Sequence, residues 1–164
     1  METLEAIRTL RSVRTFAERP VPEETIHEIL NAGRRSQSSK NTQPWQFVVV
    51  RDRELLVQLA ACGQYAGHLA GAAFAVAIFS TDEWAYDIGQ ASAYMQLAAW
   101  DRGVGSCIAS IYEPAKARAI LGAPDEQFIE VALSFGYPAQ PPSSTLRRGG
   151  RRPLDEVVRW DRWG

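Results

Sequence analysis

The sequence predicts an α+β fold with a central sheet between helices. Its predicted helices and strands do not follow the regular alternation that builds a doubly wound parallel sheet. An unbroken apolar run at residues 72–79 indicates a fully buried strand at the centre of a sheet. The 164 residues, 46% of them hydrophobic, are enough for one domain with a core. We therefore expect a single domain over residues 1–164, with residues 138–164 as a C-terminal arm.

In the first half of the chain the predicted elements are, in order, helix 4–10, helix 22–33, strand 45–50, helix 55–61 and strand 72–79. Leu4, Ile7 and Leu10 recur at helical spacing. Pro22, followed by two acidic residues, opens the second helix, and Gly33 ends it. The first strand is rich in aromatic and β-branched residues. The polar loop before it, residues 36–44, is therefore well placed for a ligand.

In the second half the predicted elements are helix 84–101, strand 106–109, helix 113–122, strand 128–137 and helix 154–160. The first of these is the longest helix, and its alanine-rich face suits close helix packing. Gly103 and Gly105 end it, and the next helix opens at Pro114 and closes at Gly122. Prolines after the last strand exclude helix or sheet there, so this segment is predicted to form the arm.

Charge and cysteine content indicate an ordinary cytoplasmic protein. Lys and Arg total 18 against 19 acidic residues, which gives no reason to expect nucleic acid or an anionic membrane as the main partner. Cys62 and Cys107 form no C-x-x-C pair, and no secretion signal is recognisable. The longest apolar run, residues 69–79, is too short to span a membrane.

The usual signatures of protein-based catalysis are missing from the sequence. His27 and His68 are the only histidines, too few for a histidine-rich metal site or a Ser-His-acid triad, and we interpret both as surface or hydrogen-bonded structural residues. Residues 103–108 begin like a dinucleotide fingerprint but precede a strand and end in Ile, and no P-loop occurs. A bound cofactor is thus expected to carry the chemistry.

Two polar segments carry a candidate site. Arg11, Ser12 and Arg14 follow the first helix, and two guanidinium groups with a hydroxyl can hold a terminal phosphate through bidentate hydrogen bonds. Residues 38–45, SSKNTQPW, concentrate donors and acceptors suited to the edge of a heterocycle. The alternative interpretations are a solvated helix end and a hydrophilic turn.

Taken together, these motifs resemble those of the FMN-dependent nitroreductase family. The matching segments are RSVR-x-F at 11–16, SS-x-N-x-QPW-x-F at 38–47, the helix from Asp87 to Ala99 with the glycines at 103 and 105, and RRPLDEVV at 151–158. The resemblance spans almost the whole chain. It implies a mostly antiparallel sheet and a homodimer with two FMN molecules at the subunit interface, the C-terminal arm reaching the partner.

The resemblance also implies the cofactor contacts. Arg11, Ser12, Arg14, Arg151 and Arg152 would hold the FMN phosphate. The residues that would approach the flavin and ribityl chain are Ser38, Ser39, Asn41, Gln43, Gln64, Ile108, Ala109 and Ser110. NADH or NADPH would reduce FMN in a ping-pong cycle and a nitroaromatic, quinone or related electrophile would reoxidise it, so no protein side chain is expected to be catalytic. Trp84, Tyr86 and Tyr112 are candidates for the pocket wall.

Several alternatives remain open at this point. Position 10 is Leu where many family members have a further Arg, and His68 lies where they often have a flavin-edge Lys. The chain could be a specialised FMN enzyme that dehalogenates, fragments flavin or dehydrogenates, or a non-catalytic FMN-binding dimer. RNA binding through the arginine-rich residues 147–152 is a further alternative. A role of these arginines in holding the FMN phosphate explains the cluster better.

Overall fold

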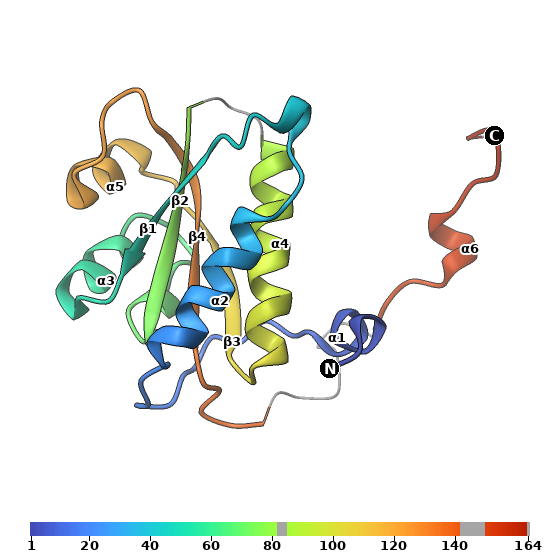
Figure 1. The fold of residues 1–164 in the computed structure, drawn as a ribbon, viewed down its shortest axis with the longest axis horizontal. Coiled ribbons are helices and arrows are strands. Elements are labelled where there is room, and N and C mark those ends of the chain that lie inside the picture. The colour runs from blue at the N-terminus through green and yellow to red at the C-terminus, as the bar shows by residue number, and fades with distance from the viewer. Residues whose placement is uncertain (82–84, 142–149, 164) are drawn as a thin grey trace.

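A computed structural model describes residues 1–81, 85–141 and 150–163 (Figure 1). The α-helices are α1 (Thr3–Thr9), α2 (Glu23–Arg34), α3 (Arg53–Ala60), α4 (Ala85–Asp101), α5 (Pro114–Leu121) and α6 (Leu154–Val157). The strands are β1 (Trp45–Val50), β2 (Phe74–Ser80), β3 (Gly105–Ser110) and β4 (Phe128–Gly136), with 3-10 turns η1 (Ser39–Asn41) and η2 (Gly67–Leu69). The predicted α+β class is confirmed.

The four strands form one antiparallel sheet in the order β1-β2-β4-β3. Strand β2 lies inside the sheet and every one of its seven residues is buried, as its unbroken apolar run predicts. Strand β3 is at one edge, where Cys107 pairs with Ser134 and Ile108 with Leu133 of β4. This arrangement leaves the outer edge of β3 available to other segments of the chain.

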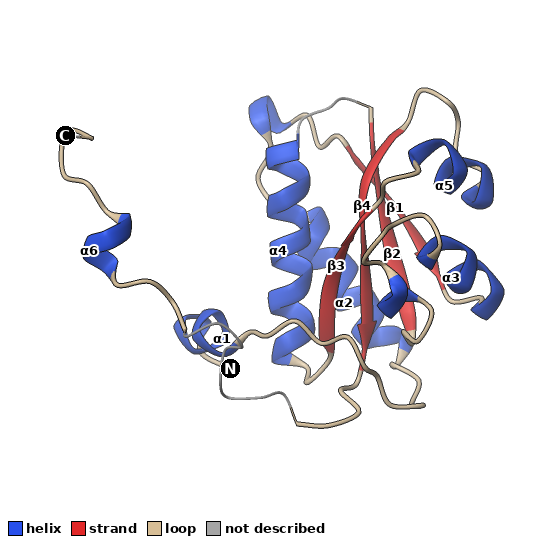
Figure 2. Cartoon of the chain, turned by 180° about the vertical axis from the view of Figure 1, so that it is seen from behind, coloured by secondary structure: helices blue, strands red, loops and turns tan. Residues whose placement is uncertain are grey.

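Helices cover both faces of the sheet, as Figure 2 shows, with α2 and α4 on one face and α3 and α5 on the other. On the α2 and α4 side, Ile29, Met95 and Phe135 belong to one buried cluster. On the other side, Leu56 and Leu59 belong to a second. Gly33, predicted to end α2, instead lies inside it: a Cβ there would come within 2.3 Å of the Met95 Cε, so glycine permits the close approach of α4.

Helix α1 forms where the spacing predicts it, but its apolar face is not buried by the described residues. Only Ala6 of this helix is buried, whereas Leu4 is 80% exposed and Ile7 is also exposed. The helix is tied to the end of α4 by polar contacts: the Met1 amino group pairs with Asp101 at 2.6 Å. An apolar face left open in one chain suits a contact with another molecule.

The predicted helix at 154–160 is wrong in extent, because α6 ends at Val157 and Val158 is extended. A helix of four residues with no buried side chain has little to stabilise it, since isolated short helices are marginal in water. Figures 1 and 2 both show α6 standing away from the sheet, beyond α1. Trp84, Arg147 and Arg148, like most of the proline-rich segment, lie outside the described residues. No described helix is long and apolar enough to cross a membrane.

Candidate functional site

The segment after α1 lies along the outer edge of β3. Ser12 forms a parallel bridge with Ser106, and the Val13 backbone N–H donates to the Ser106 carbonyl at 2.9 Å. Val13 lies where a side chain at Gly105 would be, since a Cβ there would come within 2.5 Å of Val13. Gly105 therefore lets the arginine motif lie against the sheet.

The two guanidinium groups of this motif have no carboxylate partner within the described ranges. The Nη1 of Arg11 donates to the carbonyls of Arg8 and Leu10 at 3.0 and 2.8 Å, while its Nε is buried without a hydrogen-bond partner. Arg14 and Ser12 are exposed. Two cations and a hydroxyl without an acidic counterpart are the donor set that a phosphate requires.

At the far end of β3 the chain between α3 and η2 crosses the strand. The Cys62 carbonyl accepts hydrogen bonds from the N–H groups of Tyr112 and Glu113 at 2.8 and 3.0 Å. A Cβ at Gly63 would come within 2.2 Å of the Ser110 carbonyl oxygen, so only glycine fits this crossing. These contacts place the exposed Gln64 beside the end of β3.

Between these two contacts, two residues of β3 are exposed to solvent. Ile108 is 43% exposed and Ser110 is exposed, whereas the side chain of Ala109 is buried in the core beneath. The strand thus combines exposed residues at positions 108 and 110 with arginines at one end and an amide side chain at the other.

A polar cluster lies under the same strand. His68 of η2 is buried, and its Nδ1 is 2.7 Å from the Ser134 hydroxyl. Burial lowers the pKa of the His68 imidazole and the charge of Arg14 lowers it further, while a hydrogen bond to the Ile108 backbone raises it. Burial raises the pKa of the Cys107 thiol, against the lowering effects of Arg14 and a hydrogen bond from Ser12. This cluster links the arginine motif to β3.

The second predicted segment forms a loop at the first turn of α4. The Ser39 N–H donates to the buried Asp87 carboxylate at 3.0 Å, and the Gln43 N–H donates to the Ser38 hydroxyl at 3.0 Å. Lys40, Asn41 and Gln43 all have positive φ angles near 50°. Non-glycine residues rarely adopt this backbone, and such strain concentrates at functional sites.

Within one chain the predicted site residues form two groups that lie apart. Ser39 is held at Asp87, whereas Ser12 pairs with Ser106, whose hydroxyl accepts from Gln96 at 3.2 Å. Residues 87 and 96 are about 14 Å apart along α4, at 1.5 Å per residue. Figure 1 shows the loop before β1 near one end of α4 and α1 near the other.

Arg151 and Arg152, the two arm residues predicted to hold the phosphate, are exposed. Arg152 forms an ion pair with Glu156, four residues along the arm, at 3.2 Å, and Arg151 forms no ion pair with a described residue. The structure therefore brings neither of them to Arg11 or Arg14. A pair of this kind in solvent contributes little to stability and is readily exchanged for a phosphate.

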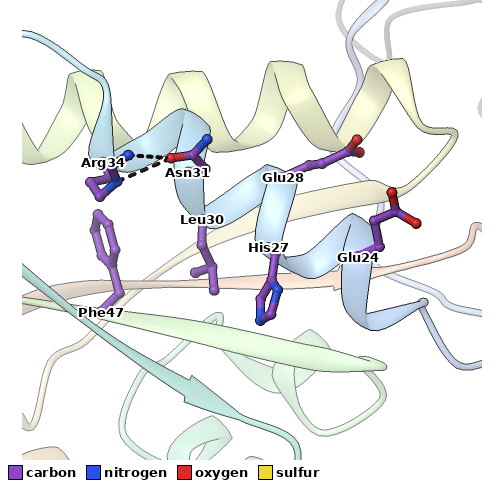
Figure 3. A pocket seen from close by; sticks show the side chains of 7 residues that line it. All are labelled: Glu24, His27, Glu28, Leu30, Asn31, Arg34 and Phe47. Carbon is purple, nitrogen blue, oxygen red and sulfur yellow. Dashed lines mark hydrogen bonds between the residues drawn. The ribbon is translucent and has the colours of Figure 1, made fainter.

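A shallow hollow of about 720 Å³ between α2 and β1 lies elsewhere on the molecule (Figure 3). Leu30 and Phe47 form its apolar part, and Arg34 donates two hydrogen bonds to Asn31, which lies on the same helix. None of the predicted site residues lines it. The edge of β3, where the arginine motif lies, therefore remains the candidate site.

The fold and the site together place this chain in a class of α+β proteins. In this class an antiparallel sheet has cationic and amide donors along one edge. The chain belongs to the nitroreductase family: the family's model matches residues 7–66 and 65–137. A relative in Archaeoglobus fulgidus, provisionally named NADH dehydrogenase/NAD(P)H nitroreductase, is 34% identical over 149 residues, covering 84% of this chain and 86% of its own.

Solved structures are similar over nearly the whole chain. A nitroreductase of Desulfovibrio desulfuricans, provisionally so named and solved in complex with FMN, is 30% identical with a TM-score of 0.84, covering 96% of this chain and 95% of its own. An FMN-dependent nitroreductase of Clostridium difficile is 26% identical with a TM-score of 0.85, covering 98% of this chain and 99% of its own. The predicted family is thereby confirmed.

Sequence reasoning missed residues that shape the site without belonging to a polar motif. The sequence predicts Gly105 as a helix breaker and as part of the resemblance, but not as the residue that admits Val13. Asp87 opens a helix that matches the family, but nothing in the sequence indicates that it anchors the loop through Ser39. The burial of His68 could not be foreseen, because its neighbours in the sequence are small residues and its partner Ser134 is 66 positions away.

Proposed function

We propose that this protein is an FMN-dependent NAD(P)H oxidoreductase that reduces nitroaromatic, quinone or related small electrophilic substrates in the cytoplasm. Family membership and relatives that carry NAD(P)H nitroreductase names support this proposal. The observation that carries it is the arginine motif on the edge of β3, because the donors there match a phosphate and no described carboxylate neutralises them.

The residues present fit FMN at both ends. Arg11, Ser12 and Arg14 would hold the phosphate, and the buried Nε of Arg11, which has no hydrogen-bond partner among the described residues, is a donor that such a ligand would satisfy. Arg151 and Arg152 would close over the phosphate from the arm. We expect a dianionic phosphate to bind here more tightly than a neutral group, because it accepts charge-assisted hydrogen bonds from the arginines.

The flavin ring would lie along the outer edge of β3. The backbone at Ile108, Ala109 and Ser110 would face its reactive edge, and the Gln64 amide would reach its pyrimidine ring. When bound, FMN accepts hydride from NADH or NADPH and passes it to the substrate in a ping-pong cycle. The part of the protein is to bind and orient both partners and to stabilise negative charge with backbone and amide donors.

The proposal includes a homodimer, in which each site is completed by the partner. The outer face of α4 carries the exposed Tyr86 and Tyr94 and the half-buried Leu97. Helix α1, whose Leu4 and Ile7 are exposed, lies beyond one end of α4 (Figure 1). The loop before β1 and the arginine motif lie beside different parts of α4, about 14 Å apart along the helix. We therefore propose that a flavin held by Arg14 contacts this loop in the partner subunit, through Ser38, Ser39, Asn41 and Gln43. A second copy would bring them to it and would receive the arm.

Titration of the apoprotein with FMN and with riboflavin, which lacks the phosphate, tests this function. Charged hydrogen bonds contribute about 1.5–3 kcal/mol each, so FMN should bind at least about tenfold more tightly than riboflavin. Arg14→Ala should remove most of this preference, and Arg51→Ala, on the surface beside Glu23, should leave it unchanged. Equal affinity for the two flavins would contradict the phosphate site.

A further inference from the structure

Helix α1 depends on other parts of the chain for its conformation. It has seven residues, and Ala6 is the only one of them that is buried. A helix this short is marginal in water by itself, so contacts with α4 must hold it. One contact joins the last turns of the two helices: the Trp100 indole Nε1 donates to the Thr9 hydroxyl at 3.0 Å, and both side chains are half-buried. This bond ties the end of α1 to the end of α4.

The direction of this hydrogen bond is fixed by its two partners. An indole N–H can only donate, so the Thr9 oxygen is the acceptor. The Thr9 hydroxyl proton is directed to the Glu5 carbonyl, 2.7 Å away in the same helix, whereas the Met1 sulfur at 3.9 Å is a much weaker acceptor. Thr9 therefore links the indole to the backbone of α1.

The same turn of α1 orients the guanidinium of Arg11. The carbonyls of Arg8 and Leu10 accept hydrogen bonds from the Arg11 Nη1 at 3.0 and 2.8 Å. The last carbonyls of a helix have no donor within it, and basic side chains nearby commonly satisfy them. Thr9 lies between the two residues whose carbonyls hold Arg11, so the segment that orients the guanidinium is the one that Trp100 ties to α4.

Arg11 lies between two points at which the chain is attached. Before it, Thr9 is held by Trp100, and after it, the Val13 N–H donates to the Ser106 carbonyl on β3 at 2.9 Å. Arg11 itself is half-buried, and its Nε is buried with no hydrogen-bond partner among the described residues. Without the Trp100 contact, the turn that precedes Arg11 would lose this attachment to α4.

We propose that Trp100 is a positioning residue of the phosphate site, which acts on Arg11 through Thr9 and the last turn of α1 and does not touch the cofactor. The inference rests on the proposed function, because it assigns Arg11 to the FMN phosphate. A guanidinium that is already ordered loses less conformational entropy when a ligand binds. The Trp100 contact should therefore raise the affinity for the phosphate of FMN and leave the affinity for the flavin ring unchanged.

Three variants remove or keep this contact. Trp100→Phe removes the indole N–H and keeps an aromatic ring. Thr9→Val replaces the hydroxyl with a methyl group of similar size, whereas Thr9→Ser is the conservative variant, because its hydroxyl can still accept from Trp100. Ser92→Ala is the control: Ser92 donates to the Ile88 carbonyl within α4, and this bond does not involve α1.

The dissociation constants of the apoprotein for FMN and for riboflavin separate positioning from a merely structural role. Trp100→Phe and Thr9→Val should each weaken FMN binding by about threefold to tenfold, the net effect of one hydrogen bond, and riboflavin binding by less than about twofold. The double variant should lose no more than the single variant with the larger loss, because both changes break the same contact. Thr9→Ser and Ser92→Ala should stay within about twofold of the wild type for both flavins. Equal losses for the two flavins, additive losses in the double variant, or unchanged FMN binding would overturn the inference.

A measurement without flavin keeps the inference independent of the proposed function. In ¹⁵N–¹H NMR spectra of the apoprotein, the Trp100 indole signal is identified by its loss in Trp100→Phe. This signal should move and exchange faster with solvent in Thr9→Val but not in Thr9→Ser, and the Arg11 Nε–H signal should move in Trp100→Phe. An unmoved indole signal in Thr9→Val, or an unmoved Arg11 signal in Trp100→Phe, would overturn the inference. If these signals move as expected but the wild type binds FMN no better than riboflavin, the proposed phosphate site alone is contradicted.

Discussion

Val13 occupies the space that a side chain at Gly105 would need: a Cβ built at Gly105 would lie 2.5 Å from Val13 Cγ2 and 2.6 Å from its Cβ. Gly136 admits Phe16 in the same way, with a closest approach of 2.8 Å. These two contacts hold segment 11–16 against the edge of the sheet. The position of the arginine motif therefore depends on glycines that lie far from it in the sequence.

Gly105→Ala should displace this segment. The added methyl group overpacks a site closed by the β-branched side chain of Val13, which costs about 1–3 kcal/mol in the free energy of unfolding. FMN affinity should also fall, because Ser12 and Arg14 move with Val13. Chemical denaturation and FMN titration measure both effects. Gly71→Ala, where a Cβ would have nothing within 4 Å, is the control and should show neither.

Arg152→Ala should weaken FMN binding, because the arm is proposed to close over the phosphate. The local pair with Glu156 is exposed and offers little competition. Arg159→Ala is the matched control: this arginine lies in the same arm and donates to the carbonyls of Asp155 and Val158. Loss of one charge-assisted contact should weaken affinity about tenfold or more for position 152 only. Equal losses in the two variants would argue against a specific phosphate contact.

Tyr94→Asp together with Leu97→Asp should convert a dimer to a monomer. Tyr94 is 40% exposed and Leu97 is half-buried on the outer face of α4, so the charges would be desolvated in an interface but tolerated in a monomer. Light scattering after size exclusion measures the mass. Val57→Asp on α3, also an exposed apolar position, should leave the mass unchanged. A wild type that is monomeric at micromolar concentration would refute the shared site.

The stability of the protein should depend on pH through His68. Its folded-state pKa is lowered below the ordinary value of 6.5, and Arg14 and Cys107 are the titratable groups that share its surroundings. Below pH 6.5 the unfolded chain therefore binds a proton that the folded chain does not, and stability is lost as the pH falls. Denaturation series at several pH values should show this loss in wild type and in His27→Gln, and a smaller loss in His68→Gln.

The helices and strands could be predicted from the sequence because their signals are local. The apolar run of β2 and the aromatic and β-branched composition of β1 give the strands within two residues of their bounds. The end of α6 at Val157 could not be predicted, because the helical pattern that begins at Leu154 continues to Trp160 while no buried side chain supports it. Propensity alone does not fix the end of a helix that lacks tertiary contacts.

The candidate site could be predicted only as two motifs, and their arrangement could not. Nothing in the sequence indicates that Ser12 pairs with Ser106, or that the loop at Ser39 is held by Asp87 at the other end of α4. These contacts join positions 94 and 48 residues apart, which the spacing within each motif does not encode. The same holds for His68 and Ser134, whose link beneath β3 depends on the pairing of the strands.

The most direct test of the central claim is the visible absorption spectrum of the purified protein, recorded in air and again without oxygen after addition of NADPH or NADH. We predict flavin bands that bleach with one or both nicotinamides. Bands that bleach with dithionite but with neither nicotinamide would leave a flavin-binding protein without this activity. A colourless protein that cannot be reconstituted with FMN would contradict the account.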